Sequence, residues 1–174
     1  MASIAIVLGS VRPGRFGEQV VRWIEDQARQ VEGVQTVFFD LRDYNLPFFA
    51  EEMSPSMKAP ELAEAVRLRT NLEANDAVVF VTPEYNHSVP AALKNAIDYL
   101  PPATLKEKAV GLVGYSWYGA VKPLEHLREI LSTFGADVRE QQVGINLGSD
   151  FQDGVFTPSE ELNAQIRELL ASLV

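Results

Sequence analysis

The chain alternates short apolar runs rich in β-branched residues with longer stretches in which apolar residues recur every three or four positions. The short runs are typical of buried strands, and the longer stretches are typical of amphipathic helices. Five such strand–helix pairs follow one another without an internal repeat, a linker or a low-complexity tract. This alternation predicts an α/β domain on a parallel sheet, because parallel strands need a crossover and the crossover is usually a helix.

The apolar pattern places the five strands at residues 3–8, 34–39, 77–81, 108–115 and 138–145. Helices are expected around residues 20–31, 60–73, 90–100, 121–134 and 162–173, and the last is preceded by a capping box at Thr157-Pro158-Ser159-Glu160. Residues 41–57, which include Pro47 and Pro55, are expected to form a long ordered loop. Right-handed crossovers that cover both sheet faces predict a single doubly wound, three-layer sandwich over residues 1–174.

Composition excludes several kinds of partner and chemistry. Of 174 residues 47% are hydrophobic, enough for one core, and 24 Asp and Glu against 15 Lys and Arg give a net charge of −9. An acidic surface repels polyphosphate, so neither nucleic acid nor an anionic membrane is an expected partner. The absence of cysteine excludes disulfides, thiolate-bound metals and a cysteine nucleophile, and with only two histidines no metal site is expected.

The sequence also indicates a cytoplasmic protein. No apolar run reaches the roughly 18 residues that a membrane-spanning helix needs. The apolar residues 4–8 have no basic flank before them and run directly into Gly9-Ser10. They are therefore expected to form a strand and not the core of a signal peptide.

Ligands of doubly wound sheets bind beyond the carboxyl ends of the strands, and the first loop there has the composition of an anion site. Its amides and the following helix N-terminus form an anion cradle, to which Arg12 and Arg15 add charge and Ser10 a hydroxyl. With neither G-K-[ST] nor G-x-G-x-x-G, the loop suits one phosphate better than a nucleoside triphosphate or a dinucleotide. The alternative is a solvated turn whose arginines pair with carboxylates such as Glu18. Asp40 is expected to cap the end of the second strand. The loop reads Gly9-Ser10-Val11-Arg12-Pro13-Gly14-Arg15-Phe16-Gly17.

The second loop, residues 82–88, joins a buried strand to a helix between two prolines. Such a rigid polar platform suits a planar heterocycle, which Tyr85 could stack on and Asn86 could hydrogen-bond. Alternatively, Tyr85 covers the core edge and Asn86 caps the turn. His87 has no evident acid partner in the sequence and is expected to be a polar residue at the rim, not a base.

The third loop, residues 114–120, follows the fourth strand and contains two aromatic residues, Trp117 and Tyr118. Its glycines allow close backbone approach. Exposed aromatics here would need cover from a ligand or a second subunit, and core packing of Trp117 is the alternative.

At these loops the chain resembles the NAD(P)H-dependent FMN reductases of flavodoxin-like fold, which include quinone, azo-dye and chromate reductases. The first loop, Gly9-Ser10-x-Arg12-x-x-Arg15, looks like the family's phosphate loop, and Leu46-Pro47-Phe48-Phe49 resembles its loop after the second strand. The most specific likeness is the long motif after the third strand, Pro83-Glu84-Tyr85-Asn86-x-Ser88-x-Pro90-x-x-Leu93-Lys94-Asn95-Ala96-Ile97-Asp98.

The resemblance implies a flavodoxin-like sandwich with a five-stranded parallel sheet of order 2-1-3-4-5, and it implies a set of FMN-binding residues. The phosphate and the start of the ribityl chain would be held by Ser10, Arg12, Arg15, Phe16 and Gly17. The isoalloxazine would be lined by Pro83, Glu84, Tyr85 and Asn86, with His87 at the rim and Ser116 at the flavin edge. Near the third loop many relatives carry an arginine where this chain has Lys122. Lysine keeps the positive charge but lacks the planar guanidinium with which arginine could bind the pyridine nucleotide.

The function implied by the resemblance is a two-step flavin reductase. NAD(P)H, the co-substrate, would give a hydride to flavin N5, and a second small-molecule acceptor (free flavin, a quinone, an azo compound or a metal oxyanion) would take it in a ping-pong scheme. No side chain is expected to be catalytic, because the cofactor carries the chemistry. The family usually forms homodimers or homotetramers, with Phe48, Phe49 and Trp117 as candidates for that surface. The alternatives are a flavodoxin-like electron carrier and a non-catalytic FMN-binding protein.

Overall fold

A parallel sheet forms the middle layer of the structure, a computed structural model that describes residues 1–174. Its strands are β1 (Ala2–Leu8), β2 (Val34–Asp40), β3 (Ala77–Pro83), β4 (Ala109–Ser116), β5 (Asp137–Val138) and β6 (Val143–Asn146). Their order is β2-β1-β3-β4-β5, and β6 pairs in parallel with β4 beyond β5. The predicted parallel sheet of order 2-1-3-4-5 is confirmed.

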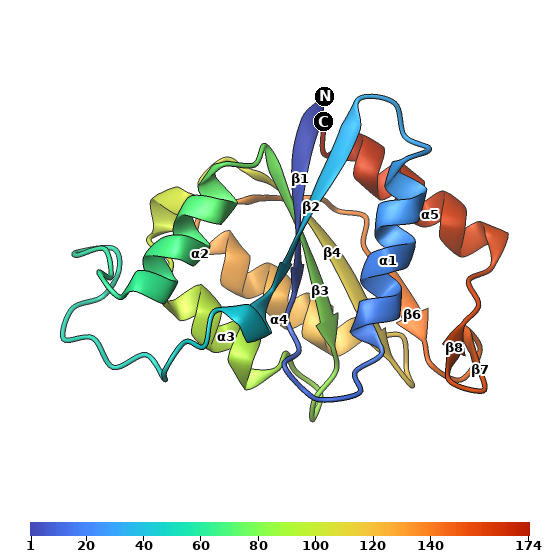
Figure 1. The fold of residues 1–174 in the computed structure, drawn as a ribbon, viewed down its shortest axis with the longest axis horizontal. Helices are drawn as coiled ribbons and strands as arrows, with labels where there is room; N and C mark the ends of the chain where they lie inside the picture. The colour runs from blue at the N-terminus through green and yellow to red at the C-terminus, as the bar shows by residue number, and fades with distance from the viewer.

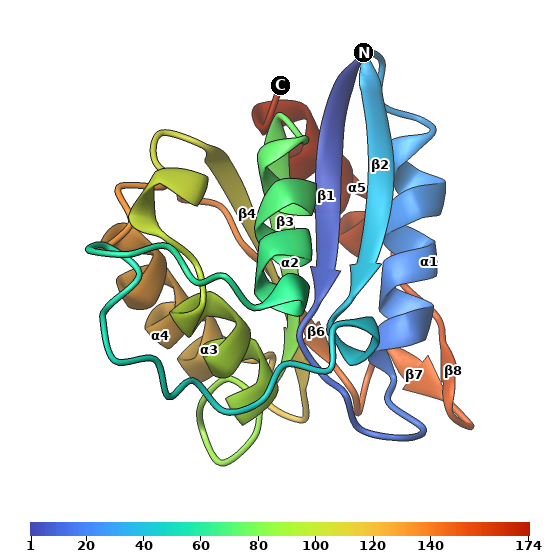
Figure 2. The same cartoon turned by 60° about the vertical axis from the view of Figure 1, so that its left-hand side comes forward.

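Helices cover both faces of this sheet. α1 (Gly17–Ala28) and α5 (Glu160–Ser172) lie on one side, and α2 (Ala63–Glu73), α3 (Ala91–Asp98) and α4 (Val121–Ser132) lie on the other (Figures 1 and 2). The three-layer flavodoxin-like sandwich is therefore confirmed. The longest helix, α5, has 13 residues, and no helix has both the length and the hydropathy to cross a bilayer.

Alternating side chains of the strands build two separate cores. Ile4, Ile6 and Leu8 of β1 belong to a cluster of 21 buried residues under α1 and α5, whereas Ala5 and Val7 join a cluster of 18 under α2, α3 and α4. Every residue of β3 is buried because this strand lies in the centre of the sheet. The period of two thus divides the apolar residues between the two helical layers.

The fifth strand differs from the continuous one predicted at 138–145. It is split into β5, which pairs with the start of β4, and β6, which pairs with its end. Between them the guanidinium of Arg128 on α4 donates to the carbonyls of Val138, Arg139 and Glu140 and to the side chain of Gln142. Because Arg128 satisfies these three carbonyls, the chain can leave the ladder after Arg139, whose amide still donates to Val110 of β4, without exposing them unpaired.

Several helix boundaries also differ from the prediction, and α1 spans Gly17–Ala28 instead of residues 20–31. α2 begins at Ala63 and not near Pro60, α3 ends at Asp98 and not at Leu100, and α4 ends at Ser132. The predicted capping box is wrong, because the cap of α5 is Ser159, whose hydroxyl accepts from the amide of Leu162 at 3.1 Å. Glu160 does not reach back to a cap but bonds forward to Arg167 at 2.7 Å.

The segment after β2 is an ordered loop, as predicted, that begins with the short 3-10 turn η1 (Leu41–Asp43). The side chain of Asn95 on α3 fixes its middle: the amide group donates to the carbonyl of Pro47, and the amide oxygen accepts from Phe49 N, both at 2.8 Å. The ring of Phe49 packs edge-on against Tyr99 at 5.1 Å. A second 3-10 turn, η2 (Pro102–Thr104), follows α3.

A hairpin that the sequence analysis did not predict follows β6. β7 (Phe151–Gln152) and β8 (Val155–Phe156) are joined by Asp153 and Gly154, both at positive φ. Asp-Gly between two such residues is a common two-residue hairpin turn and could have been recognised. The hairpin places Phe151 against Phe16, with ring centroids 4.8 Å apart, so it supports the start of α1.

The carboxyl ends of β1, β3 and β4 point to the same edge of the sheet, the lower edge in Figures 1 and 2. The two chain termini lie at the opposite edge. The three loops singled out in the sequence therefore lie side by side, which is what a ligand site in this fold requires.

We expect Asn95→Ala to destabilise the loop after β2. It removes two hydrogen bonds that have no other source in the structure, at a cost of about 1–3 kcal/mol in free energy of unfolding. Urea unfolding measures the loss, and hydrogen exchange at the Phe49 amide localises it. The control is Lys94→Ala, which removes an exposed ion pair with Asp98 on the same helix and should change stability by less than about 1 kcal/mol. Equal effects of the two substitutions would contradict this account of the loop.

Candidate functional site

A cavity of about 370 Å³ opens at the carboxyl edge of the sheet, a volume within the usual range for small-molecule sites. All three loops contribute to its wall. The lining residues are Arg12, Gly14, Arg15, Phe16, Pro83, Glu84, Tyr85, Tyr115, Ser116, Trp117 and Leu147. The structure thus brings together seven of the eleven residues predicted for cofactor binding. The other four do not line the cavity: Ser10 and Gly17 of the first loop are buried, and Asn86 and His87 of the second loop are exposed to solvent.

The first loop delivers free amides to the cavity. Backbone N–H groups of residues 14–17 make no hydrogen bond with a protein acceptor, as expected for the first turn of a helix. Gly17 allows α1 to start close to the sheet: a Cβ there would lie 2.5 Å from Leu8 Cδ1 and 2.6 Å from the Tyr115 hydroxyl. The start of α1 therefore has both the donors and the dipole to bind an anion.

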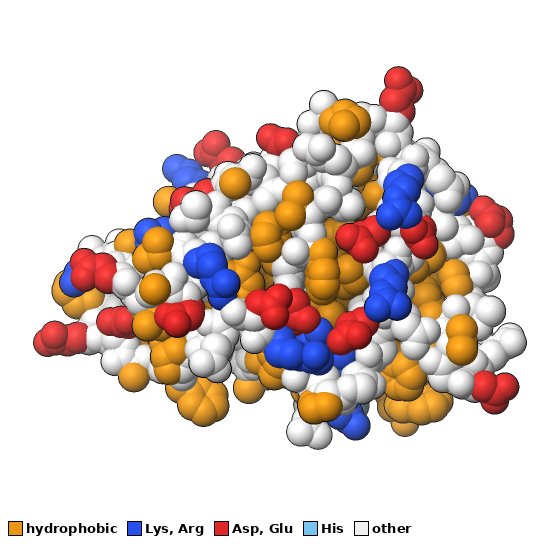
Figure 3. Space-filling model, in the orientation of Figure 1, with side chains coloured by type: hydrophobic (Ala, Val, Ile, Leu, Met, Phe, Trp, Pro, Cys, Tyr) orange, Lys and Arg blue, Asp and Glu red, His pale blue; other side chains and the backbone are white.

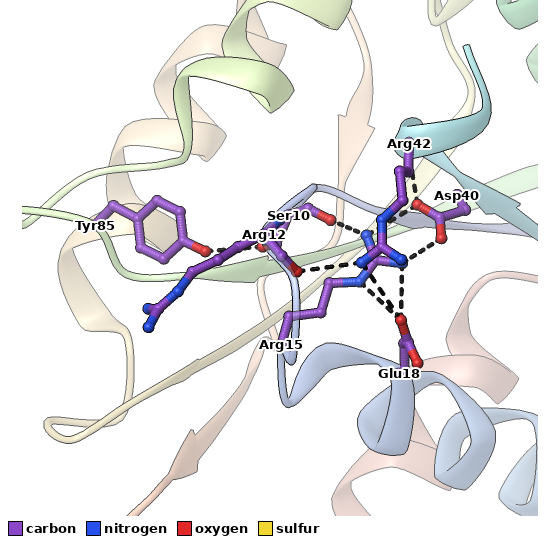
Figure 4. Close-up of polar contacts among 7 residues, drawn as sticks. All are labelled: Ser10, Arg12, Arg15, Glu18, Asp40, Arg42 and Tyr85. Atoms are coloured by element: carbon purple, nitrogen blue, oxygen red, sulfur yellow. Dashed lines mark hydrogen bonds and ion pairs between the residues drawn. The ribbon is translucent and has the colours of Figure 1, made fainter. Parts of the chain in front are cut away.

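Arg15 is engaged within the protein. Its buried guanidinium donates to both carboxylate oxygens of Asp40, to Glu18 at 3.2 Å and to the carbonyl of Ser10 (Figure 4). The alternative stated for the loop, an arginine paired with Glu18, thus describes Arg15. Its direct contact with a phosphate stays a prediction, and its observed contacts tie the first loop to the end of β2.

Asp40 caps the end of β2, as predicted, and its carboxylate accepts from the amide of Arg42 at 2.9 Å. Burial by itself would raise its pKa, but the hydrogen bonds from Arg15 and the Arg42 amide, with the charges of both arginines, bring the pKa below its ordinary value. For Arg15, burial would lower the pKa, and the Asp40 and Glu18 carboxylates raise it. Both groups are charged at neutral pH.

Arg12, in contrast, has a free side chain. It extends away from the Arg15–Asp40 pair on the same side as Tyr85, and no carboxylate binds its guanidinium (Figure 4). Beneath it the hydroxyls of Ser10 and Tyr85 are 2.8 Å apart, which joins the first loop to the second. The two arginines of the loop therefore differ: one is saturated by carboxylates and the other is available to an anion.

The second loop contains a pair that the sequence analysis missed. His87 Nδ1 lies 3.1 Å from Glu84 Oε1, so the expectation that His87 has no acid partner is wrong. The imidazole is 79% exposed, in line with a place at the rim, while the Glu84 side chain is only 9% exposed. The contact depends on left-handed backbone at Asn86 and His87, which no residue pattern indicated.

In the third loop the hydroxyl oxygen of Ser116 accepts from the amides of Tyr118 and Ala120, at 3.0 and 2.8 Å. Its hydrogen remains available to a ligand. Trp117 and Tyr118 are exposed, so the alternative of core packing for Trp117 is excluded. Lys122 is bound to Glu125 at 2.8 Å on the surface of α4.

Tyr115 and Leu147 line the cavity but were not predicted as site residues. Tyr115 is buried, and its hydroxyl faces the side chain of Ser10 and the amide of Gly17 without a hydrogen bond of good geometry to either. Burial raises its pKa far above the ordinary value, so the hydroxyl stays protonated and can donate. Strand alternation could have placed Tyr115 beneath α1, two residues after Val113 on the same sheet face.

Charge on the surface is mixed and not segregated. On the face shown in Figure 3 basic and acidic side chains alternate, and most of the basic ones have an acidic neighbour. A binding site for an anion therefore depends on the local donors of the first loop and not on a broad positive field.

Comparison with known proteins gives one consistent result. Residues 2–150 match the family described as NADPH-dependent FMN reductase. The chain is 33% identical over 137 residues to an NAD(P)H-dependent FMN reductase of Nectria sp., covering 75% of this chain and 68% of that protein. It is 39% identical over 97 residues to a quinone reductase of Pseudomonas putida, covering 55% of this chain but only 48% of the relative, about half its length.

Among solved structures, a flavoenzyme NAD(P)H:(acceptor) oxidoreductase of Paracoccus denitrificans superposes with a TM-score of 0.75 and 25% identity. The superposition covers 98% of this chain and 96% of that one. The structural similarity thus extends beyond the matched segment to α5.

We expect Asp40→Asn to lower the free energy of unfolding by about 3 kcal/mol at pH 7, because it leaves the buried Arg15 short of a carboxylate. A carboxyl whose pKa is lowered in the folded state stabilises the protein above its ordinary pKa of about 4 and loses this contribution as the pH falls further. The stability of the wild type should therefore decline below about pH 4 more steeply than that of the variant. Urea unfolding between pH 2.5 and 7 measures both effects, and parallel curves would contradict the assignment.

Proposed function

The chain belongs to the NADPH-dependent FMN reductase family, and we propose that it is itself an NAD(P)H-dependent reductase that acts through bound FMN. The family is one of oxidoreductases with FMN as cofactor and NAD(P)H as reductant. The observation that carries the proposal is the convergence of the family's loops on one cavity, which combines an anion cradle with a flat, partly aromatic wall.

The residues present fit FMN. A terminal phosphate needs several donors and a cation, and the cavity offers the free amides of residues 14–17 and the guanidinium of Arg12. Glu84 lines the cavity, and one of its carboxylate oxygens, Oε2, is buried without a hydrogen-bond partner in the protein. An unpartnered buried carboxylate oxygen is costly, and a hydrogen-bond donor on a ligand that reaches Glu84 would satisfy it.

The roles of the side chains follow from their contacts. Arg12, Phe16 and the amide of Gly17 would hold the phosphate end, while Arg15 and Ser10 fix the loop from below. Pro83, Glu84, Tyr85 and Asn86 would line the isoalloxazine, with His87 at the rim and the hydroxyl of Ser116 donating to the flavin edge. FMN, when bound, supplies hydride acceptance and release, which none of these side chains can provide.

We further propose that reductant and acceptor use the same open cavity in turn, in a ping-pong sequence. The acceptors would be small molecules such as free flavin, quinones, azo compounds or metal oxyanions. The name of the Pseudomonas putida relative supports quinones as the class to test first. With no membrane-spanning helix in the structure, the cytoplasm is the compartment we propose.

A homodimer or homotetramer is proposed on the basis of aromatic side chains near the site. Phe48 is 82% exposed and Trp117 is 65% exposed, although large apolar groups are usually covered. Phe49, the other candidate for such a surface, packs within the chain on Tyr99. Light scattering of the purified protein would measure the oligomeric state.

The function is tested by oxidation of NADH and NADPH by the purified protein, with and without FMN and with a benzoquinone as acceptor. Oxidation that requires both FMN and the acceptor is the expected result. FMN binding without oxidation of either nucleotide would favour the electron-carrier or non-catalytic alternative.

We expect Arg12→Ala to weaken FMN binding by about 10- to 150-fold, the loss of ~1.5–3 kcal/mol typical of a hydrogen bond to a charged group. Riboflavin, which lacks the phosphate, should bind both proteins equally. Arg22→Ala, which removes an exposed arginine on α1, is the matched control and should leave the FMN affinity unchanged. Quenching of flavin fluorescence measures the affinities of the wild type, Arg12→Ala and Arg22→Ala. Equal FMN affinity of Arg12→Ala and wild type would exclude Arg12 from the site.

A further inference from the structure

The second loop contains a tight turn whose backbone is costly for the residues that form it. Tyr85 and Ser88 exchange two backbone hydrogen bonds of 2.9 and 3.1 Å, so the chain reverses over Asn86 and His87 alone. Both residues have left-handed backbone, with φ of 50° and 63°. This conformation costs roughly 1–2 kcal/mol per residue other than glycine, although Asn and His tolerate it better than most.

The turn returns His87 toward the start of its own loop. Its Nδ1 lies 3.1 Å from Oε1 of Glu84, three residues earlier in the chain. A glycine at residue 87 would form the same turn with less strain but would bring no imidazole to Glu84. Strained backbone that persists at a ligand cavity points to a use for the side chain it positions.

Glu84 connects this imidazole to the interior of the site. Glu84 is a residue of the cavity wall, its side chain is nine-tenths buried, and its second oxygen, Oε2, is buried without a hydrogen-bond partner. His87 lies at the other end of the pair, where 79% of its side chain is exposed to solvent. The two groups therefore form a continuous path for a proton from bulk water to the cavity wall.

We propose that Glu84 and His87 are a proton relay that serves the acceptor in the reductase reaction, an inference that rests on the proposed function. Reduction of a quinone by NAD(P)H consumes one solvent proton: NAD(P)H + H⁺ + quinone gives NAD(P)⁺ + hydroquinone. The C4–H bond of the nucleotide breaks and supplies one hydride, that is, two electrons and one proton. The second proton must reach a quinone oxygen inside the cavity.

The relay supplies this second proton. The imidazolium of His87 gives its Nδ1 proton to Glu84 Oε1, and a half-turn of the carboxyl group presents the O–H to the cavity. The O–H bond breaks as a new one forms on the acceptor oxygen, which leaves Glu84 as a carboxylate. His87 then takes up a proton from water, so every proton is accounted for and no further reactant is needed.

Few other ionisable groups surround the pair. Arg12, Arg15, Tyr85 and the protonated Tyr115 lie in the wall of the same cavity. On α4, His126 Nδ1 is 3.0 Å from the hydroxyl of Ser88, and Glu125 lies beside it. His126 contacts the turn but neither member of the pair, which makes it the matched control.

The kinetic test compares an acceptor that needs protons with one that does not. Wild type, Glu84→Gln, His87→Asn and the control His126→Asn are loaded with FMN and assayed with a benzoquinone and with ferricyanide, which takes up electrons only. Asn tolerates the left-handed backbone at residue 87, so His87→Asn keeps the turn. Glu84→Gln and His87→Asn should slow quinone reduction about 100-fold more than ferricyanide reduction, the usual scale of general acid catalysis, and added imidazole should partly restore His87→Asn.

A second readout does not depend on turnover. In the protein without flavin, ¹⁵N spectra of the imidazole at pH 8 should show His87 with its hydrogen on Nδ1, and Glu84→Leu should shift it toward Nε2. The tautomer of His126 should not respond to this substitution. A His87 tautomer that is insensitive to Glu84 would overturn the pairing on which the relay rests.

The remaining outcomes separate the relay from the proposed function. If the variants lose quinone and ferricyanide reduction to the same extent, or lose neither, the relay is overturned and the reductase assignment stands. If the wild type reduces neither acceptor with NADH or NADPH, the proposed function fails, and the relay fails with it.

Discussion

The guanidinium of Arg15 is held between the ends of two neighbouring strands, and the shape of the site depends on it. It binds Asp40 at the end of β2, Glu18 on α1 and the carbonyl of Ser10 just after β1. These contacts fix the first loop at three points, and the amides at the start of α1 make no hydrogen bond with a backbone acceptor. A buried ion pair of this kind is weak evidence for stability, but here it determines the conformation of a loop that would otherwise be a solvated turn.

The fold was largely predictable because its strongest signals are local in sequence. The continuous apolar runs of β1 and β3 reflect burial on both faces of the sheet, and the helical period of α1 reflects burial on one face, so both signals are present in the local sequence. The predicted continuous fifth strand failed for a nonlocal reason. Arg128, on a different element, takes the carbonyls that the ladder would have used, and no pattern within residues 138–145 indicates this.

The sequence predicts which loops form the site, but it does not predict the contacts that each side chain makes there. The three loops follow from the parallel sheet, since its strands all end at one edge, and the structure places them around one cavity. What the sequence does not contain is how each side chain is used. Arg12 and Arg15 are indistinguishable in a one-dimensional motif, and only the partner Asp40, 25 residues away, separates the saturated arginine from the free one. The contact between Glu84 and His87 is equally hidden, because it depends on two residues of left-handed backbone.

The difference between the two arginines also explains how a chain with a net charge of −9 can hold an anion at all. The acidic surface as a whole repels an anion. Binding must therefore come from a few fixed donors close to the ligand, where salt screens the interaction between charges least. Arg15 cannot contribute a net charge, since Asp40 and Glu18 compensate it, but it places the amides of α1 in position. Arg12 then needs to supply only a single charge at short range. The same cavity wall contains a carboxylate, Glu84, which would repel a second anionic group. The site is thus asymmetric, positive at the start of α1 and acidic at the end of β3, and this polarity favours a ligand with one anionic end and a neutral, hydrogen-bonding body.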